Sequence, residues 1–163
     1  MPSPVAFTKV IIGADHQGAA LKRDLVAWLE RRGLAVDDRR DRASLRSSRV
    51  STRADDDYPR IAAAVARALK ASKAETGLLI CGSGNGMVIA ANRFAHIRAA
   101  LAPAPSYAVK ARQDENANVL VLPAWWVNRT AARRILTVWL STRPSRAARH
   151  RRRIRQLTAL PHD

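Results

Sequence analysis

The sequence contains a single cysteine, Cys81, among its 163 residues. One cysteine cannot form a disulfide within the chain, so we expect a protein of a reducing cytoplasm. The sequence also has no apolar run near the roughly 20 residues that a membrane-spanning helix needs. Its first residues, MPSPVAFTKV, lack the charged start and long apolar core of a secretion signal. These absences predict a cytoplasmic protein with no membrane partner.

Acidic residues are few: 13 Asp and Glu stand against 29 Lys and Arg, which gives a net charge of +16. Such a charge attracts polyanions, so nucleic acids and phosphorylated metabolites are both candidate partners. A third interpretation is a solvated arginine-rich surface without a specific partner. Aromatic residues make up only 5% of the chain and are not interleaved with the basic ones. Since stacking platforms of that kind are typical of nucleic-acid binding, nucleic acid is the less favoured partner.

Apolar segments and helical patterns alternate along the chain, which we interpret as one domain over residues 1–163. Short apolar runs predict strands at 9–13, 34–38, 77–81, 98–102 and 118–122. Helical spacing predicts helices at 17–33, from Pro59 through Leu69, at 87–94, 106–116 and 131–140, and a helical tail within 144–163. This order predicts an α/β fold, a Rossmann-like three-layer αβα sandwich around a five-stranded parallel sheet. Residues 38–57, which contain few apolar side chains, predict a mobile arginine-rich surface loop.

Ligands of such sheets bind beyond the carboxyl ends of the strands. This rule selects Asp15 and His16 after the first strand and the segment CGSGNG, residues 81–86, after the third. Glycines at 82, 84 and 86 let backbone N–H groups converge on an anion beside a helix N-terminus. A tight structural turn is the alternative. The segment is not a dinucleotide fingerprint, because Met87 stands where a further glycine would be needed.

Cys81 itself has two interpretations. Most lone cysteines at the end of a buried strand act as small apolar side chains. However, a thiol beside a helix N-terminus and an N–H cradle is placed where a thiolate is stabilised, and it can supply a base near neutral pH. The residues alone leave both possibilities open.

Several motifs together identify a family. They are GADHQGAALK (13–22), DYPRIA (57–62), GLLICGSGNGMVIAANR (77–93), IRAAL (97–101), NANVLVL (116–122) and RHRRRI (149–154). In this order they resemble ribose-5-phosphate isomerase B and the galactose-6-phosphate isomerase subunits, over residues 9 to 157. The resemblance implies an aldose-ketose isomerase of a phosphorylated sugar, acting through a cis-enediolate without metal or organic cofactor. Ribose 5-phosphate is then the default substrate.

The resemblance also implies roles in catalysis. Cys81 matches the base that moves a proton between two substrate carbons, and Ser83 matches the hydroxyl that moves a proton between two substrate oxygens. The backbone around Asn85 and Gly86 matches the anion hole for the enediolate, in the same cradle as Gly82 and Gly84. Preorganised N–H donors stabilise charge that develops on oxygen, so this assignment is chemically consistent.

Further residues match the family's substrate contacts. Asp15 matches a residue that holds substrate hydroxyls, His16 one that approaches the phosphate or ring oxygen, and Tyr58 a pocket wall. Arg149 and Arg153, which lie on one helical face, match a phosphate-binding pair suited to a dianion. From the residues alone, Asp15 could equally be a helix cap, and the two arginines part of a solvated or RNA-binding stripe.

The sequence departs from the family at three positions. Asp114 and Glu115 occupy the places of a histidine, which assists ring opening, and an asparagine, while Trp125 replaces the arginine of a Gly-x-Arg motif. In the family these positions reach the neighbouring subunit, which implies a homodimer or tetramer with shared active sites. We keep Asp114 as a catalytic candidate. The alternatives are an open-chain substrate, such as a tetrose phosphate, and a catalytically weak paralogue that only binds a sugar phosphate.

Overall fold

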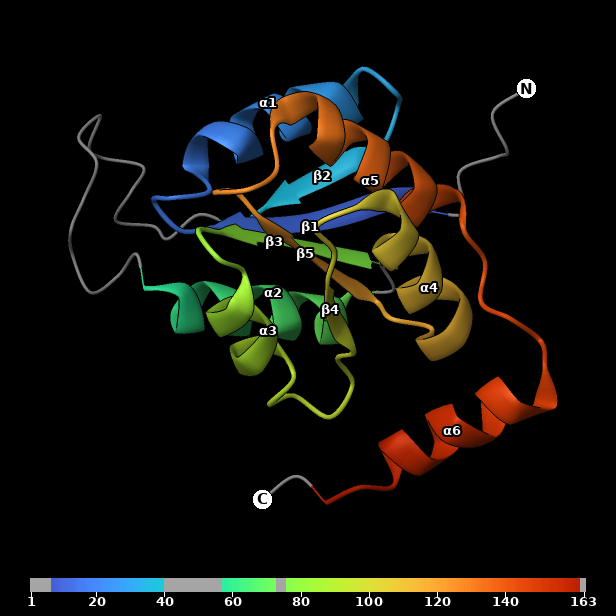
Figure 1. Cartoon of the computed structure of the whole chain (residues 1–163). Coiled ribbons are helices and arrows are strands. Elements are labelled where there is room, and N and C mark those ends of the chain that lie inside the picture. The colour runs from blue at the N-terminus through green and yellow to red at the C-terminus, as the bar shows by residue number, and fades with distance from the viewer. Residues whose placement is uncertain (1–6, 40–56, 73–75, 162–163) are drawn as a thin grey trace.

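The computed structural model describes residues 7–39, 57–72 and 76–161. Its elements, labelled in Figure 1, are β1 (Lys9–Ala14), α1 (Ala19–Glu30), β2 (Ala35–Asp38), α2 (Tyr58–Ala71), β3 (Thr76–Cys81), α3 (Asn85–Ala91), β4 (Ala99–Leu101), α4 (Pro105–Glu115), β5 (Val119–Pro123), α5 (Arg129–Ser141) and α6 (Ala148–Thr158). Within these ranges, no helix is long and apolar enough to cross a membrane. Of the predicted loop at 38–57, residues 40–56 lie outside the described residues.

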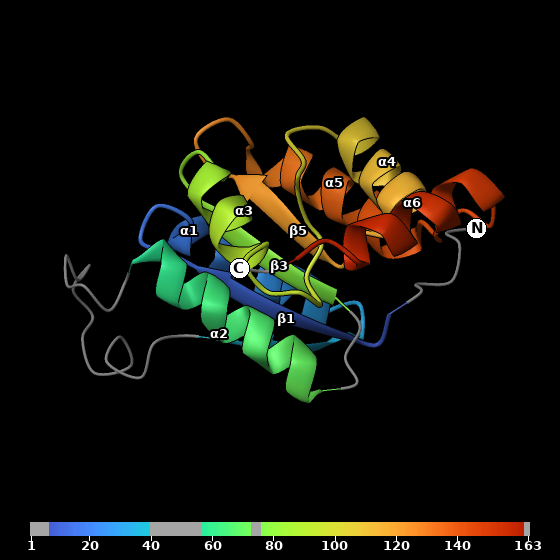
Figure 2. The ribbon, with the colours of Figure 1, turned by 90° about the horizontal axis from the view of Figure 1, so that it is seen from below.

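The five strands form one parallel sheet in the order β2-β1-β3-β5-β4. Helices α1, α4 and α5 pack on one face and α2 and α3 on the other (Figures 1 and 2). Neighbouring side chains of each strand enter different cores. Ile12 of β1 and Ile80 of β3 face α1 and α5, while Ile11 of β1 and Leu79 of β3 face α2. All four are fully buried, as expected for a parallel sheet covered on both sides. The predicted α/β class and three-layer architecture are therefore confirmed.

Two helix boundaries differ from the sequence prediction. The first helix spans Ala19–Glu30, which is shorter than 17–33, and Gly33 is the expected stop: it takes a positive φ of 77° that turns the chain. The N–H of Leu34 then bonds back to the carbonyl of Leu29 at 3.3 Å. The helix predicted at 87–94 begins earlier, at Asn85, and ends at Ala91.

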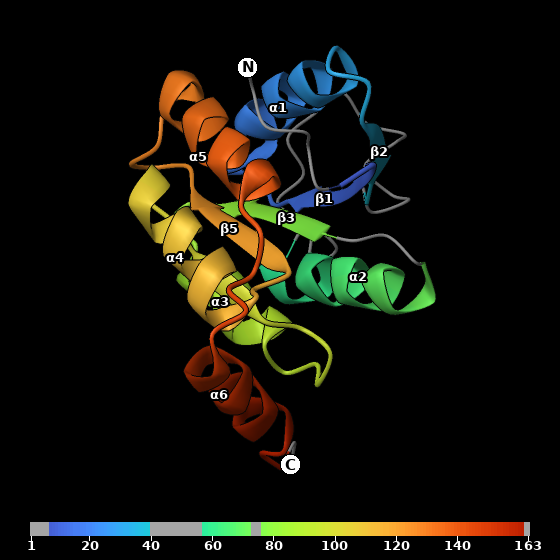
Figure 3. The same cartoon turned by 90° about the vertical axis from the view of Figure 1, so that its right-hand side faces the viewer.

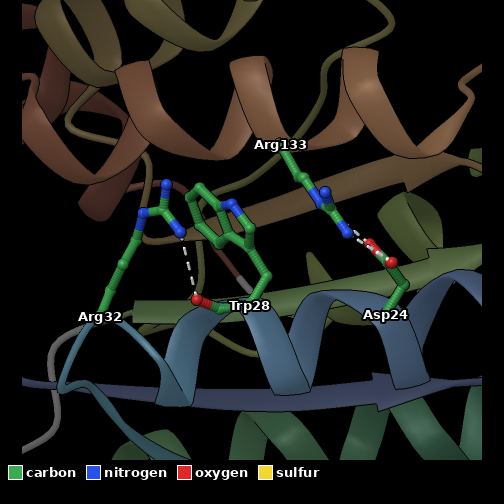
Figure 4. A network of polar contacts seen from close by, with 4 residues as sticks. All are labelled: Asp24, Trp28, Arg32 and Arg133. Atoms are coloured by element: carbon green, nitrogen blue, oxygen red, sulfur yellow. Dashed lines mark hydrogen bonds and ion pairs between the residues drawn. The ribbon is translucent and has the colours of Figure 1, made fainter.

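Helices α1 and α5 are joined by polar contacts as well as by apolar packing (Figure 4). The guanidinium of Arg133 donates two hydrogen bonds to the carboxylate of Asp24, at 3.0 and 2.6 Å. One turn after Asp24, Trp28 is buried, and the guanidinium carbon of Arg32 lies 3.7 Å from the centre of its ring. A bidentate pair of this kind fixes the relative position of two helices better than a single ion pair does.

Helix α6 lies beyond the three layers and packs against α4 (Figures 1 and 3). Its approach is set by the buried Arg112 near the end of α4, which donates to the carbonyls of Ala117 and Thr142. The N–H of Ser145 adds a bond to the carbonyl of Gln113 at 2.9 Å. Burial, and secondarily the charge of Arg98, lowers the pKa of Arg112 to about 10. The segment that leads into α6 is thus bound to the end of α4.

Candidate active site

The carboxyl ends of β1 and β3, on the left in Figure 1, bring Asp15 and Cys81 to the same edge of the sheet. Asp15 is buried, with 7% of its surface exposed. Its backbone N–H donates to the carbonyl of Ile80 at 3.3 Å, and its Oδ1 accepts the N–H of Gly18 at 3.1 Å. This carboxylate is therefore held at the start of α1, next to the strand that carries the thiol.

The CGSGNG segment, called the cradle below, forms a tight turn between β3 and α3. Gly84 has a φ of 83°, a conformation that favours glycine, and α3 begins at the next residue. The N–H of Gly84 points to Sγ of Cys81 at 3.2 Å, and the N–H of Asn85 points to Oγ of Ser83 at 3.3 Å. Thiol and hydroxyl are thereby fixed on one turn of backbone, where an anion can meet the start of a helix.

The charge state of Cys81 differs from the expectation. Burial raises the pKa of the thiol above its ordinary value, and the negative charge of Asp15 raises it further. Hydrogen bonds from the N–H groups of Gly84 and Met87 lower it, but they do not outweigh burial. In the free protein the thiol is therefore protonated at neutral pH. Cys81 is both a core residue, 5% exposed, and a member of the cradle.

Two aromatic rings flank the cradle. A Cβ at Gly86 would lie 2.6 Å from the ring of Tyr58, and a Cβ at Gly82 would overlap the indole of Trp125. Trp125 remains 62% exposed, and its Nε1 donates to Oε1 of Gln17 at 3.3 Å. The position of Tyr58 was expected, whereas the stacking of Trp125 on Gly82 was not. The only sequence signal for it is that its loop follows β5, at the same edge.

The remaining candidates at this edge are more open. His16 and Asn85 are exposed, and Ser83 is half-buried. Within the described parts of the chain, no three His, Cys, Asp or Glu side chains lie together as a metal site. Backbone N–H groups are the donors that the cradle offers, and these suit an anion.

Asp114, Arg149 and Arg153 lie at the other end of the molecule. Helix α4 starts beyond the carboxyl end of β4 and runs back, so Asp114 comes close to the amino end of β5. Cys81 is paired with Pro123 at the carboxyl end of β5. The length of that strand separates the two edges by roughly 13 Å, at about 3.3 Å per residue. One chain therefore does not bring these three residues to its own thiol.

The second group has its own geometry. Nδ1 of His150 lies 3.6 Å from Oδ1 of Asp114, and Nζ of Lys110 lies 3.7 Å from Oδ2 of the same carboxylate. Nε of Arg149 donates to Nε2 of His150 at 3.2 Å. Arg149 and Arg153 are exposed on α6. The sequence did not single out His150, since a histidine among arginines carries no local signal of burial.

Comparisons with known proteins agree with the family resemblance. The family model described as Ribose/Galactose Isomerase matches residues 10–157. Ribose-5-phosphate isomerase B of Escherichia coli (strain K12) is 37% identical over 152 residues, which cover 93% of this chain and 95% of the relative.

Two further relatives concern substrate and fold. D-erythrulose-4-phosphate isomerase of Pectobacterium atrosepticum is 35% identical over 131 residues, covering 80% of this chain and 81% of the relative. The crystal structure of ribose-5-phosphate isomerase B from Mycoplasma genitalium with bound ribulose-5-phosphate superposes with a TM-score of 0.79 at 34% identity, covering 92% of this chain and 93% of that one.

Proposed function

The chain belongs to the ribose/galactose isomerase family and is a sugar-phosphate aldose-ketose isomerase, and we propose that Cys81 is its base and ribose 5-phosphate its substrate. The observation that carries this proposal is the cradle of residues 81–86, in which a thiol and a hydroxyl share one turn and each accepts a backbone N–H. The name of the relative with bound ribulose-5-phosphate supports the choice of sugar.

The proposed reaction is a balanced proton transfer. The Cys81 thiolate takes the proton from the carbon beside the carbonyl, which leaves a cis-enediolate and a neutral thiol. The N–H groups around Asn85 and Gly86 stabilise the oxygen that becomes negative, and the Ser83 hydroxyl moves a proton between the two substrate oxygens. The thiol then returns its proton to the neighbouring carbon, which gives the ketose. Asp15 holds substrate hydroxyls, Tyr58 and Trp125 form walls, and no oxidant or reductant is consumed.

The raised pKa of Cys81 favours the second proton transfer and disfavours the first. A protonated thiol is a competent acid for the second proton transfer, whereas the first requires the thiolate. Turnover limited by the first transfer should therefore increase as the pH rises above neutrality. The N–H groups of Gly84 and Met87 supply the stabilisation that makes the thiolate accessible.

We further propose that the protein acts in a reducing cytoplasm. We also propose that the active unit contains two copies of the chain. The cradle and the Arg149 group lie at opposite edges of one chain, and each is half of a site for a phosphorylated sugar. In a symmetric dimer, α6 of one copy can supply Arg149 and Arg153 to the cradle of the other. The exposed guanidinium groups on α6 suit a phosphate dianion.

Replacement of the thiol tests the catalytic assignment. Cys81→Ala should fold and bind product, while kcat with ribose 5-phosphate falls by roughly 100-fold or more, the usual scale for loss of a general base. Cys81→Ser should also be poor, because a hydroxyl is a far weaker base. A coupled isomerase assay measures kcat, and calorimetry with ribulose 5-phosphate measures binding. Near-normal turnover in the alanine variant would sink the assignment.

A second candidate function is isomerisation of a four-carbon sugar phosphate. Asp114 occupies the place of the family's ring-opening histidine, and a tetrose with a terminal phosphate needs no ring opening. The relative from Pectobacterium atrosepticum bears the name of such an enzyme. Parallel measurements of kcat/KM with erythrose 4-phosphate and ribose 5-phosphate separate the two functions: a tenfold advantage of the tetrose, which is about 1.4 kcal/mol, would favour the second.

The basic face of α6 also keeps the nucleic-acid alternative testable. If Arg149→Ala leaves the KM for sugar phosphate unchanged but abolishes retention on RNA, with a steep dependence on salt, the stripe binds nucleic acid. We expect the opposite, a raised KM and no specific retention on RNA.

A further inference from the structure

A chain of polar contacts joins α4 to α6 and ends on a guanidinium group. His150 is the one residue of α6 that is classed as buried, with 9% of its surface exposed. Its Nε2 accepts a hydrogen bond from Nε of Arg149 at 3.2 Å. Its Nδ1 has no hydrogen-bond partner among the described residues, and it lies 3.6 Å from Oδ1 of Asp114.

The contacts assign the protons on the imidazole. A ring nitrogen that accepts a hydrogen bond carries no proton, so the proton of neutral His150 is on Nδ1. Nδ1 lies near the carboxylate of Asp114 without a hydrogen bond between them, and the negative charge favours the same tautomer. Nε of Arg149 is held by His150, while the Arg149 side chain remains exposed.

We infer that Asp114 is a positioning residue that acts through His150 to orient Arg149 for the phosphate of the substrate. This inference rests on the proposed role of Arg149 in phosphate binding. The sequence left Asp114 as a catalytic candidate, and this inference gives it a different role, because its carboxylate lies next to His150 and Lys110. A guanidinium fixed at Nε presents a ready-made fork, which reduces the entropy lost when phosphate binds.

The arrangement also accounts for an unusual feature of α6. A helix that is otherwise largely exposed buries a histidine next to the first of the two arginines proposed to bind phosphate. Among the described residues, Arg149 hydrogen-bonds to His150 and Arg153, one turn further along α6, does not, so the two arginines are not equivalent. Asp114 therefore tunes Arg149 in particular and not the whole face of α6.

A double-mutant cycle tests this coupling. The KM for ribose 5-phosphate and the inhibition constant of inorganic phosphate are measured for the parent, Asp114→Ala, Arg149→Ala and the double variant. Asp114→Ala should raise both constants by roughly 3- to 10-fold, the scale of one lost polar contact, while kcat changes far less. In the Arg149→Ala background, Asp114→Ala should add nothing, because no guanidinium remains to be oriented.

Three results would overturn the inference, and they differ from one another. If Asp114→Ala remains harmful without Arg149, the carboxylate only docks α6. If Asp114→Ala lowers kcat and leaves phosphate inhibition unchanged, Asp114 acts in the chemistry. If Arg149→Ala itself does not change phosphate inhibition, the phosphate assignment fails and the inference fails with it, while the role of Cys81 is unaffected.

Two control variants sharpen the result. Lys110→Ala removes the other partner of Asp114 and leaves the contact with His150, so phosphate inhibition should change by no more than about twofold, as for an exposed ion pair. Asp114→Asn keeps an oxygen that can accept the Nδ1 proton and should restore most of the lost affinity. Thermal melting checks that each variant is folded. If the asparagine variant is folded and binds phosphate as weakly as the alanine variant, the inference that Asp114 orients Arg149 through His150 is contradicted.

Discussion

At Cys81, four local influences decide whether the sulfur is charged. Burial and the carboxylate of Asp15 raise the pKa of the thiol, while the N–H groups of Gly84 and Met87 lower it. The helix that follows has only seven residues, so its dipole adds little. Since burial is the largest influence, the pKa of the thiol is raised in the free protein.

Neutralisation of Asp15 should make the thiolate form at lower pH. In Asp15→Asn the amide oxygen can still accept the N–H of Gly18, but the negative charge that raises the pKa of Cys81 is gone. The thiolate absorbance in the ultraviolet reports this pKa without ambiguity, because Cys81 is the only cysteine. The same titration in the Cys81→Ala background measures the absorbance change of the tyrosines, which is then subtracted. Glu115→Gln, at the far edge, is the control that should leave the midpoint unchanged, and an equal or higher midpoint in Asp15→Asn contradicts the assignment.

At the scale of elements, the end of α4 is held by an internal cation. Arg112 donates to the carbonyls of Ala117 and Thr142 and lies 5.0 Å from the ring centre of Phe7 and 5.4 Å from that of Trp139. It therefore bonds the turn after α4, the segment before α6 and the core of one layer at once. Asp114 is two residues further along the same helix. The geometry of the proposed phosphate half-site thus depends on a buried side chain.

Arg112→Met should destabilise the fold although it removes a buried charge. Methionine fills part of the volume but leaves two carbonyls without donors, at a cost of about 2 to 4 kcal/mol. For a chain of this length, that lowers the melting temperature by roughly 5 to 15 °C. Circular dichroism during heating measures it. Arg143→Met, an exposed position, is the matched control, and a melting temperature of Arg112→Met equal to that of the control would contradict this account.

Sequence patterns predicted the elements well and the contacts between them poorly. Apolar runs marked all five strands, and glycine spacing marked the cradle, because both depend on local backbone preferences. The stacking of Trp125 on Gly82 depends on two loops that meet at the sheet edge. The contact of Asp114 with His150 depends on how Arg112 directs the chain into α6. Neither has a periodic signature. The charge of Cys81 could not be predicted because it is a balance between burial and hydrogen bonds.

For the whole molecule, the main feature is the separation of two half-sites. The cradle with Cys81 lies at one edge of the sheet, and Arg149 with Arg153 lies at the other, on a helix that extends beyond the layers (Figure 3). Under the proposed dimer, such a division makes activity a property of the assembly. A monomer at high dilution should bind phosphate weakly and turn over little, even when fully folded.

Complementation between inactive variants tests the shared site. Cys81→Ala lacks the base, and Arg149→Ala/Arg153→Ala lacks the phosphate contacts. When the two proteins are unfolded and refolded together, half of the dimers should be mixed, and each mixed dimer should contain one complete site. Activity should then recover to about one quarter of the parent, as symmetry predicts. Refolding each variant by itself is the control. Activity of the mixture that stays at the sum of the separate variants would mean that each site lies within one chain.

The indole of Trp125 turns the cradle into an optical probe. Trp28 and Trp139 are buried, whereas Trp125 and Trp126 are exposed, and Trp125 lies against Gly82 of the cradle. A sugar that displaces water from the Trp125 ring should change its fluorescence whether or not a proton is later transferred. Occupancy can therefore be titrated in the parent and in Cys81→Ala alike, with Trp125→Phe as the reference that reports the neighbouring Trp126. A compound that quenches the Trp125 fluorescence without being converted is a ligand. A compound that quenches it and is also converted is a substrate.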